Sequence, residues 1–203
     1  MRQNFIKSIT VFPLAIIFSG LLILIACSNN ETSQSFDAND NDISQNGNQP
    51  MISKSGRYVL IYNGEIYNHL ELRKELEKFS ISKKPWNGYS DTETILECFD
   101  NYGLQKTLEK MQGMFSMAIY DNINKHIFLV RDRIGEKPLY YVKYSKYFIF
   151  GSEIKSLKIH PSFKNILHNP SIECLMRYNF IKAPYSIFKD VYKVMPGSII
   201  SFS

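Results

Sequence analysis

Tyr58-Val-Leu-Ile-Tyr62 is a continuous apolar run, and the pair Asn63-Gly64 follows it directly. A short apolar run bounded by a turn-forming pair is typical of a strand buried on both faces. We therefore predict a buried strand that ends in a turn at Asn63-Gly64. A functional role for these two polar positions is the alternative, and the run by itself favours the turn.

Helix patterns follow this run, and several strand patterns follow the helices. Leu72, Leu76 and Phe79 repeat at helical spacing behind Asn68, which stands where a helix N-cap would. Ser90-Asp-Thr-Glu93 fits a capping box that starts a second helix. Further strands are predicted at 114–120, 126–130, 139–144 and 147–150, and short helices at 153–157 and 170–179. This order predicts an α+β layered domain.

The composition is that of an ordinary globular protein, with 44% apolar and 21% charged residues. The net charge of +5 comes from scattered Lys and Arg, so we expect a solvated surface and no nucleic-acid partner. Three cysteines do not make a disulfide framework, and the His and Cys spacings offer no metal site. Cys98 and Cys174 lie in helix-like apolar patterns, so we predict that both are buried small hydrophobes.

Residues 1–27 differ in kind from the rest. Arg2 and Lys7 precede an uncharged apolar run from Ile9 to Ala26, which is typical of a signal peptide or a membrane segment. Leu24-Ile-Ala-Cys27 resembles a bacterial lipobox, in which Cys27 would carry a lipid. An uncleaved transmembrane helix is the alternative. Both interpretations predict attachment to a membrane through the N-terminus.

The next segment, residues 28–41, is dominated by Ser, Asn, Asp, Glu and Gln. Its apolar surface is too small to offset the entropy of ordering, so we predict a polar tether. The globular domain is expected to occupy residues 42–203.

Four segments of this domain together resemble the class II glutamine amidotransferase domain of asparagine synthase. They are Tyr62-Asn-Gly-Glu-Ile-Tyr-Asn68, Ser90-Asp-Thr-Glu93, Arg131-Asp-Arg-Ile-Gly-Glu-Lys-Pro-Leu-Tyr-Tyr141 and Phe150-Gly-Ser-Glu-Ile-Lys-Ser-Leu157. The resemblance implies the αββα sandwich of N-terminal-nucleophile hydrolases. Here that sandwich is expected to be incomplete. Its first strands should lie in residues 1–41, but this stretch is predicted to be a signal or membrane segment followed by a polar tether.

The resemblance also implies a site for glutamine. In the family, a terminal Cys thiolate attacks the side-chain amide of glutamine, and the α-amino group of that Cys acts as the base. The side-chain amide of Asn63 and the backbone N–H of Gly64 would form the oxyanion hole, where Gly permits close approach to the substrate. Asp91 would accept a hydrogen bond from the α-ammonium group, with help from the Glu65 region. The flanking residues thus favour function over a simple turn at Asn63-Gly64.

A cluster of charged residues invites another hypothesis. Arg131, Asp132, Arg133 and Lys137 would suit a phosphate site. The family places this segment in a connection between strands, held by structural ion pairs. We therefore expect a structural role.

Some features of the family have no counterpart in this sequence. The family begins Met-Cys-Gly, but residue 2 here is Arg. The family also has an Arg that binds the carboxylate of glutamine, and the corresponding segment here, Phe36-Asp-Ala-Asn-Asp40, contains no basic residue. Lipidation of Cys27 would block its sulfur as a nucleophile. The family's synthetase domain, which uses ATP and Mg, is not found, so no cofactor is expected in this chain.

These observations predict a fragment of the glutaminase domain of asparagine synthase that is inactive alone. The family hydrolyses glutamine to supply ammonia for the ATP-dependent conversion of aspartate to asparagine. Its members are cytoplasmic and often homodimeric. The alternatives are a lipid-anchored, non-catalytic relic that binds an amino acid, and a non-functional gene fragment.

Overall fold

The computed structural model describes residues 16–18, 21–26, 48–78, 85–144 and 147–203. The chain divides into two compact units. The first unit contains Met1–Ser28 and Tyr140–Lys193, and the second contains Asn29–Leu139 and Val194–Ser203. The four segments that carry the family resemblance are therefore shared between the two units.

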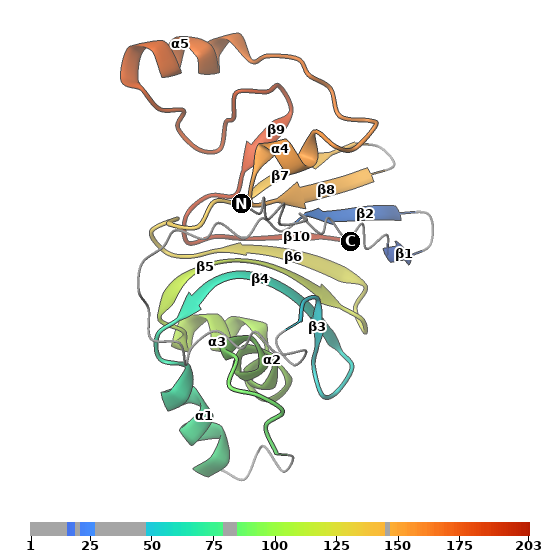
Figure 1. Cartoon of the computed structure of the whole chain (residues 1–203), viewed down its shortest axis with the longest axis vertical. Helices are drawn as coiled ribbons and strands as arrows, with labels where there is room; N and C mark the ends of the chain where they lie inside the picture. The colour runs from blue at the N-terminus through green and yellow to red at the C-terminus, as the bar shows by residue number, and fades with distance from the viewer. Residues whose placement is uncertain (1–15, 19–20, 27–47, 79–84, 145–146) are drawn as a thin grey trace, which may run out of the picture. The chain divides into compact units, whose positions relative to one another are not determined.

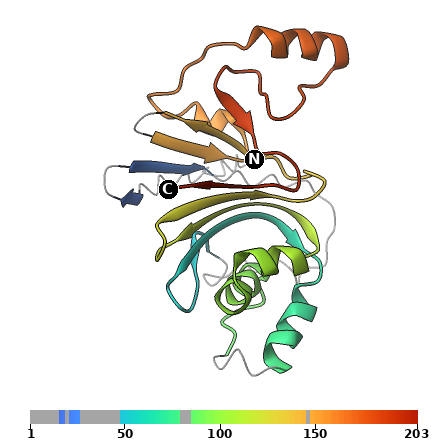
Figure 2. The same cartoon turned by 180° about the vertical axis from the view of Figure 1, so that it is seen from behind.

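The second unit is an antiparallel sheet with helices on one face (Figures 1 and 2). Its strands lie in the order β10-β6-β5-β4-β3, where the strands are β3 (Met51–Ile52), β4 (Tyr58–Ile66), β5 (Gly113–Asp121), β6 (His126–Arg131) and β10 (Ile199–Phe202). Its helices are α1 (His69–Lys78), α2 (Asp91–Tyr102) and α3 (Leu104–Lys110). Helix α2 contacts α1, α3 and β4, and so occupies the centre of the helical layer.

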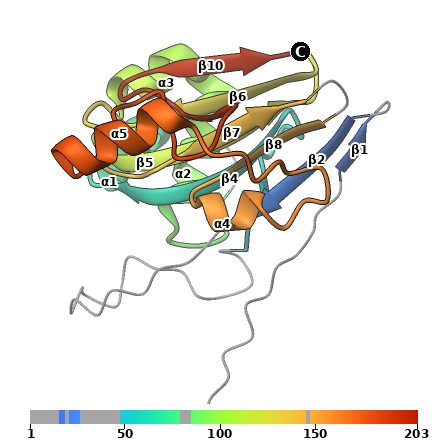
Figure 3. The same ribbon diagram turned by 90° about the horizontal axis from the view of Figure 1, so that it is seen from above.

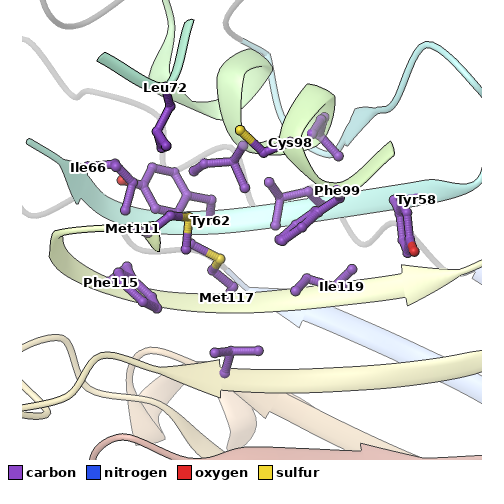
Figure 4. Packing of buried hydrophobic residues seen from close by; sticks show 14 of the residues in the cluster. Tyr58, Tyr62, Ile66, Leu72, Cys98, Phe99, Met111, Phe115, Met117 and Ile119 are labelled. Carbon is purple, nitrogen blue, oxygen red and sulfur yellow. The ribbon is translucent and has the colours of Figure 1, made fainter. Parts of the chain in front are cut away.

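The core of this unit lies between its sheet and its helices (Figure 4). Tyr58, Leu60 and Tyr62 alternate along β4 and enter this core together. The apolar run that opened the sequence analysis is thus a buried strand, as predicted.

The first unit contains a second sheet, in the order β1-β2-β8-β7-β9 (Figure 3). Its strands are β1 (Ile16–Phe18), β2 (Leu21–Ala26), β7 (Tyr140–Lys143), β8 (Tyr147–Gly151) and β9 (Val191–Lys193). Strand β2 pairs with β8 in parallel, and the other pairings are antiparallel. Helices α4 (Ile154–Leu157) and α5 (Asn169–Tyr178) complete the unit, and Val142, Ile149, Leu157, Phe163 and Val191 form its core.

The N-terminal apolar run differs from its expected form. Ile16–Phe18 and Leu21–Ala26 are strands, and β2 adds to the sheet beside β8. The expectation that this region contributes no strands is therefore wrong, because a short apolar run of Leu and Ile is compatible with a strand as well as with a helix. Within the described residues, no helix has the length and apolar character needed to cross a bilayer.

Other sequence predictions for this region are not tested. Cys27, the candidate lipid-attachment residue, and the tether at 28–41 lie outside the described residues. Signal cleavage and lipid attachment stay predictions. The α+β class is confirmed, since the described part of the chain combines two mainly antiparallel sheets with helices.

Candidate functional site

Strand β4 passes through Asn63-Gly64 without turning. The strand continues to Ile66, and Gly64 lies opposite Phe115 while Ile66 lies opposite Gly113 on β5. The predicted turn at Asn63-Gly64 is therefore wrong. Its residues belong to a strand that pairs along its whole length with a neighbour, and this pairing outweighs the local turn preference of Asn-Gly.

The structure explains why position 64 is a glycine. A Cβ atom on Gly64 would overlap the carbonyl oxygen of Met114 and lie 2.6 Å from the Cα of Phe115. A Cβ on Gly113 would likewise lie 2.9 Å from the Cα of Ile66. The two glycines thus permit close approach of two strands, whereas the sequence had suggested close approach to a substrate. The oxyanion-hole role of the Gly64 N–H remains a prediction.

Asp91 links helix α2 to this part of β4. Its Oδ2 accepts hydrogen bonds from the hydroxyl of Tyr62 at 2.6 Å and from the backbone N–H of Ile66 at 3.0 Å. These two donors lie on either side of the Asn63-Gly64-Glu65 segment in sequence. Asp91 is therefore held beside the residues with which the family resemblance associates it, through neighbours that the sequence analysis had not singled out.

The other carboxylate oxygen of Asp91 has a weaker contact. In the described structure its hydrogen bond is with the hydroxyl of Thr92, at 3.5 Å. This length is outside the usual range for an O–H···O bond. Oδ1 thus retains the capacity to accept a strong hydrogen bond from a ligand.

The cap of helix α2 leaves Asp91 available for this role. The hydroxyl of Ser90 accepts a hydrogen bond from the backbone N–H of Thr92 at 3.1 Å, so Ser90 is the N-cap. Glu93 does not complete the predicted capping box. Its carboxylate instead accepts hydrogen bonds from the backbone N–H groups of Asn87 at 2.9 Å and Gly88 at 3.1 Å.

The loop that precedes Asp91 is clamped by cations. The guanidinium of Arg73 lies 4.1 Å from the centre of the Trp86 ring, and the ammonium of Lys54 lies 4.8 Å from it. Arg73 also donates hydrogen bonds to the carbonyl oxygens of Gly88 and Ser90, at 2.8 and 2.9 Å. These contacts restrain the approach of the chain to α2, so they help to place Asp91.

Tyr62 is a functional candidate that the sequence analysis missed. Burial raises the pKa of its hydroxyl far above the ordinary tyrosine value, and the negative charge of Asp91 raises the pKa further. The hydroxyl therefore stays protonated and donates to Asp91. Its position in the quoted Tyr62–Asn68 segment was the available sequence signal, but nothing in that segment revealed its partner 29 residues away.

The charged cluster near Arg131 serves the backbone. The carboxylate of Asp132 accepts hydrogen bonds of 2.6–3.3 Å from the backbone N–H groups of Phe115, Ile134, Gly135, Glu136 and Lys137. The guanidinium of Arg131 donates to the carbonyl oxygens of Gly135, Lys137 and Val194. These contacts support the structural interpretation, because they tie both side chains to backbone groups.

Two of the three cysteines are described. Cys98 lies on α2 and is fully buried in the core, as predicted, and burial raises the pKa of its thiol to about 12. Cys174 lies on α5 and is partly exposed, so the prediction of burial is wrong for this residue. Neither residue occupies a chain end, where the family mechanism needs its nucleophile.

Comparisons with known proteins identify the family of the domain. A family model described as a glutamine amidotransferase domain matches residues 41–203. Glutamine-hydrolyzing asparagine synthetase 3 of Bacillus subtilis (strain 168) is 33% identical over 162 residues, which cover 78% of this chain and 26% of that protein. Asparagine synthetase 1 of the same organism is 35% identical over 154 residues, which cover 76% and 24%.

A solved structure was also found. Glutamine phosphoribosylpyrophosphate amidotransferase from B. subtilis, complexed with ADP and GMP, has 19% identity and a TM-score of 0.47, covering 55% of this chain and 26% of that chain. This chain spans 26% and 24% of the two asparagine synthetases. On the family match over residues 41–203, the chain belongs to the glutamine amidotransferase domain family, in the form carried by glutamine-hydrolysing asparagine synthetases.

Proposed function

We propose that this chain binds glutamine, with Asp91 as the acceptor for the α-ammonium group. The observation that carries the proposal is a pair of hydrogen bonds from β4 to Asp91. Tyr62 and Ile66 donate them, and these two residues flank the Asn63-Gly64-Glu65 segment in sequence. A carboxylate suits this role because the ligand group is a fixed cation, and charge-assisted hydrogen bonds are the stronger kind.

Asn63 and Gly64 would receive the side-chain amide of the same glutamine. Donors that already point at the developing oxyanion lower the barrier to amide cleavage, and loss of one costs about 3 kcal/mol. Glu65 follows directly on β4 and is half-buried, so it would add negative charge near the ammonium end. In this proposal one stretch of strand and one helix N-terminus hold both ends of the ligand.

We further propose that the 203-residue chain binds glutamine without cleaving it. Cleavage needs a thiolate, and two cysteines lie in the described part of the chain. The thiol of Cys98 stays protonated at neutral pH because burial raises its pKa to about 12. Cys174 lies within helix α5, so its amide nitrogen cannot serve as the amine base. In a longer protein with a terminal Cys, the ammonia released would supply an ATP-dependent synthesis of asparagine.

Isothermal titration calorimetry with glutamine tests the proposal. Asp91→Asn should weaken glutamine binding at least about tenfold, because a charge-assisted hydrogen bond is lost. Asp100→Asn is the matched control, because it makes the same change on the same helix, where Asp100 bonds to Ser55. Its affinity should equal that of the unaltered chain.

Two results would contradict the proposal. The binding site would be wrong if the unaltered chain gave no heat with glutamine, or if Asp91→Asn bound glutamine as tightly as Asp100→Asn. The claim of binding without cleavage would be wrong if the purified chain released glutamate from glutamine.

A further inference from the structure

We infer that Tyr62 is a positioning residue, whose hydroxyl holds Oδ2 of Asp91 so that Oδ1 faces the α-ammonium group of the ligand. The inference rests on the proposed function, because it assigns Asp91 to the ammonium. It adds a residue that sets the selectivity of the site for amino acids over related compounds that lack the α-amino group.

The first step is geometric. Two donors converge on one carboxylate oxygen, the hydroxyl of Tyr62 at 2.6 Å and the N–H of Ile66 at 3.0 Å. Two bonds to Oδ2 restrict rotation about the side-chain torsions of Asp91, because a different rotamer would break both of them. The direction of Oδ1 is thereby set as well.

The second step concerns how firmly Tyr62 itself is placed. Its side chain is 6% exposed and packs in the core of the second unit (Figure 4). Its backbone N–H donates to Oε1 of Gln49 at 2.6 Å, and its strand pairs with β5 at Met117. Because the ring is held in this way, its hydroxyl has a fixed position. Ligand binding therefore costs little conformational entropy at Tyr62.

The third step is the direction of the bond. Because burial and the charge of Asp91 raise the pKa of Tyr62, the phenol keeps its proton and the carboxylate accepts. The negative charge of Asp91 therefore remains on the carboxylate, and Oδ1 can accept from a cation. The hydroxyl of Thr92, 3.5 Å from Oδ1, is too distant to compete strongly for that oxygen.

The test removes one oxygen atom and measures ligand selectivity. Tyr62→Phe keeps the buried ring but removes the hydroxyl, and Tyr58→Phe makes the same change four residues earlier on the same face of β4. Calorimetry is carried out on the full chain with glutamine and with 5-amino-5-oxopentanoate, which is glutamine without its α-amino group. A thermal melt of each variant checks that it is folded.

We expect Tyr62→Phe to weaken glutamine binding about tenfold and to change binding of the deaminated analogue less than about twofold. Tyr58→Phe should leave both affinities unchanged. A merely structural role for Tyr62 would weaken both ligands alike, and that result would overturn the inference. Equal affinity of Tyr62→Phe and the unaltered chain for glutamine would also overturn it.

A second readout needs no ligand. The N–H of Ile66 donates to Oδ2 of Asp91, so its hydrogen exchange reports how firmly Asp91 is held. Exchange should be faster in Tyr62→Phe and unchanged in Tyr58→Phe. If the unaltered chain binds neither ligand, the proposed function fails. The Ile66 exchange then decides separately whether Tyr62 holds Asp91, and an unchanged rate would show that it does not.

Discussion

Helices α2 and α5 have similar lengths, 12 and 10 residues, but very different surroundings. Eight residues of α2, from Thr92 to Phe99, are buried against the sheet and its neighbouring helices. Ser171 is the buried residue of α5, and Met176 on the same helix is 80% exposed. Figure 1 shows α5 extending away from the strands of its own unit. An apolar pattern thus predicts a helix without saying whether anything packs against it.

The ends of the two helices also differ. The side chain of Ser90, the N-cap of α2, accepts a hydrogen bond from the backbone N–H of Thr92. The side chain of His168, the N-cap of α5, makes no such capping bond to the backbone and instead shares a hydrogen bond with the hydroxyl of Ser171 at 2.7 Å. Pro170 stands in the first turn of α5, and Asn179 ends the helix in the left-handed conformation at φ 60°. Local residues therefore set the limits of α5, while packing stabilises α2.

The difference matters for the proposed glutamine site, because Asp91 belongs to the packed helix. A ligand-binding carboxylate must be held within a fraction of an ångström to distinguish its ligand. The core beneath α2 and the clamp on Trp86 provide that restraint. A carboxylate on α5, such as Glu173, has no comparable support from buried neighbours on its helix.

Truncation of one buried and one exposed side chain should show the largest contrast between the helices. Phe99→Ala should lower the free energy of unfolding by about 4 kcal/mol, because Phe99 is 1% exposed and its loss leaves a cavity. Met176→Ala should change it by less than about 0.5 kcal/mol. Equilibrium unfolding in urea measures both. A large loss with Met176→Ala would mean that α5 has a packing partner in solution.

Glycine substitutions should sharpen the comparison within the packed region. Gly64→Ala should lower the free energy of unfolding by about 3 kcal/mol, because its Cβ would meet the backbone of β5. Gly56→Ala is the control, since Gly56 has positive φ but open space around its Cβ position, and should cost about 1 kcal/mol. Urea unfolding measures the free energy of unfolding of both variants. Equal losses would show that β5 can shift to accommodate a Cβ atom at position 64.

Acid should destabilise the packed region by a smaller amount. Burial alone would raise the pKa of Asp121, but hydrogen bonds from Arg57, Asn124 and the N–H of Ile123 lower the pKa to about 2. A lowered carboxyl pKa stabilises the fold above the unfolded-state value and loses that effect as pH falls. The chain should therefore lose about 2 kcal/mol between about pH 4 and pH 2.

Asp121→Asn supplies the control for this pH dependence. The variant should be less stable than the unaltered chain at pH 6, and the difference between them should shrink toward pH 2. The assignment to Asp121 fails if both chains lose stability in parallel over this range. Asp132, whose pKa is also lowered by backbone hydrogen bonds despite its burial, would then be the group to test.

The candidate residues of the site came from the sequence, and their roles stay predictions. The family segments identified Asn63, Gly64, Glu65 and Asp91, and Ser90 was recognised at the start of its helix. What was missed depends on contacts between distant residues. Asn68 looked like a helix cap, but its side chain accepts from the N–H of Gln112 and donates to the carbonyl oxygen of Lys110. No local pattern reveals such partners.

Local chemistry along the chain was enough to predict the buried strand at Tyr58, the helices that begin near Asp91 and Asn169, and the α+β class. These features follow from apolar periodicity and end signals that act over a few residues. The folded chain was needed to show that Gly64 permits the close approach of β5 and that Tyr62 donates a hydrogen bond to Asp91. Both facts arise from atoms that meet across 29 or more residues, where packing and hydrogen bonding outweigh local preference.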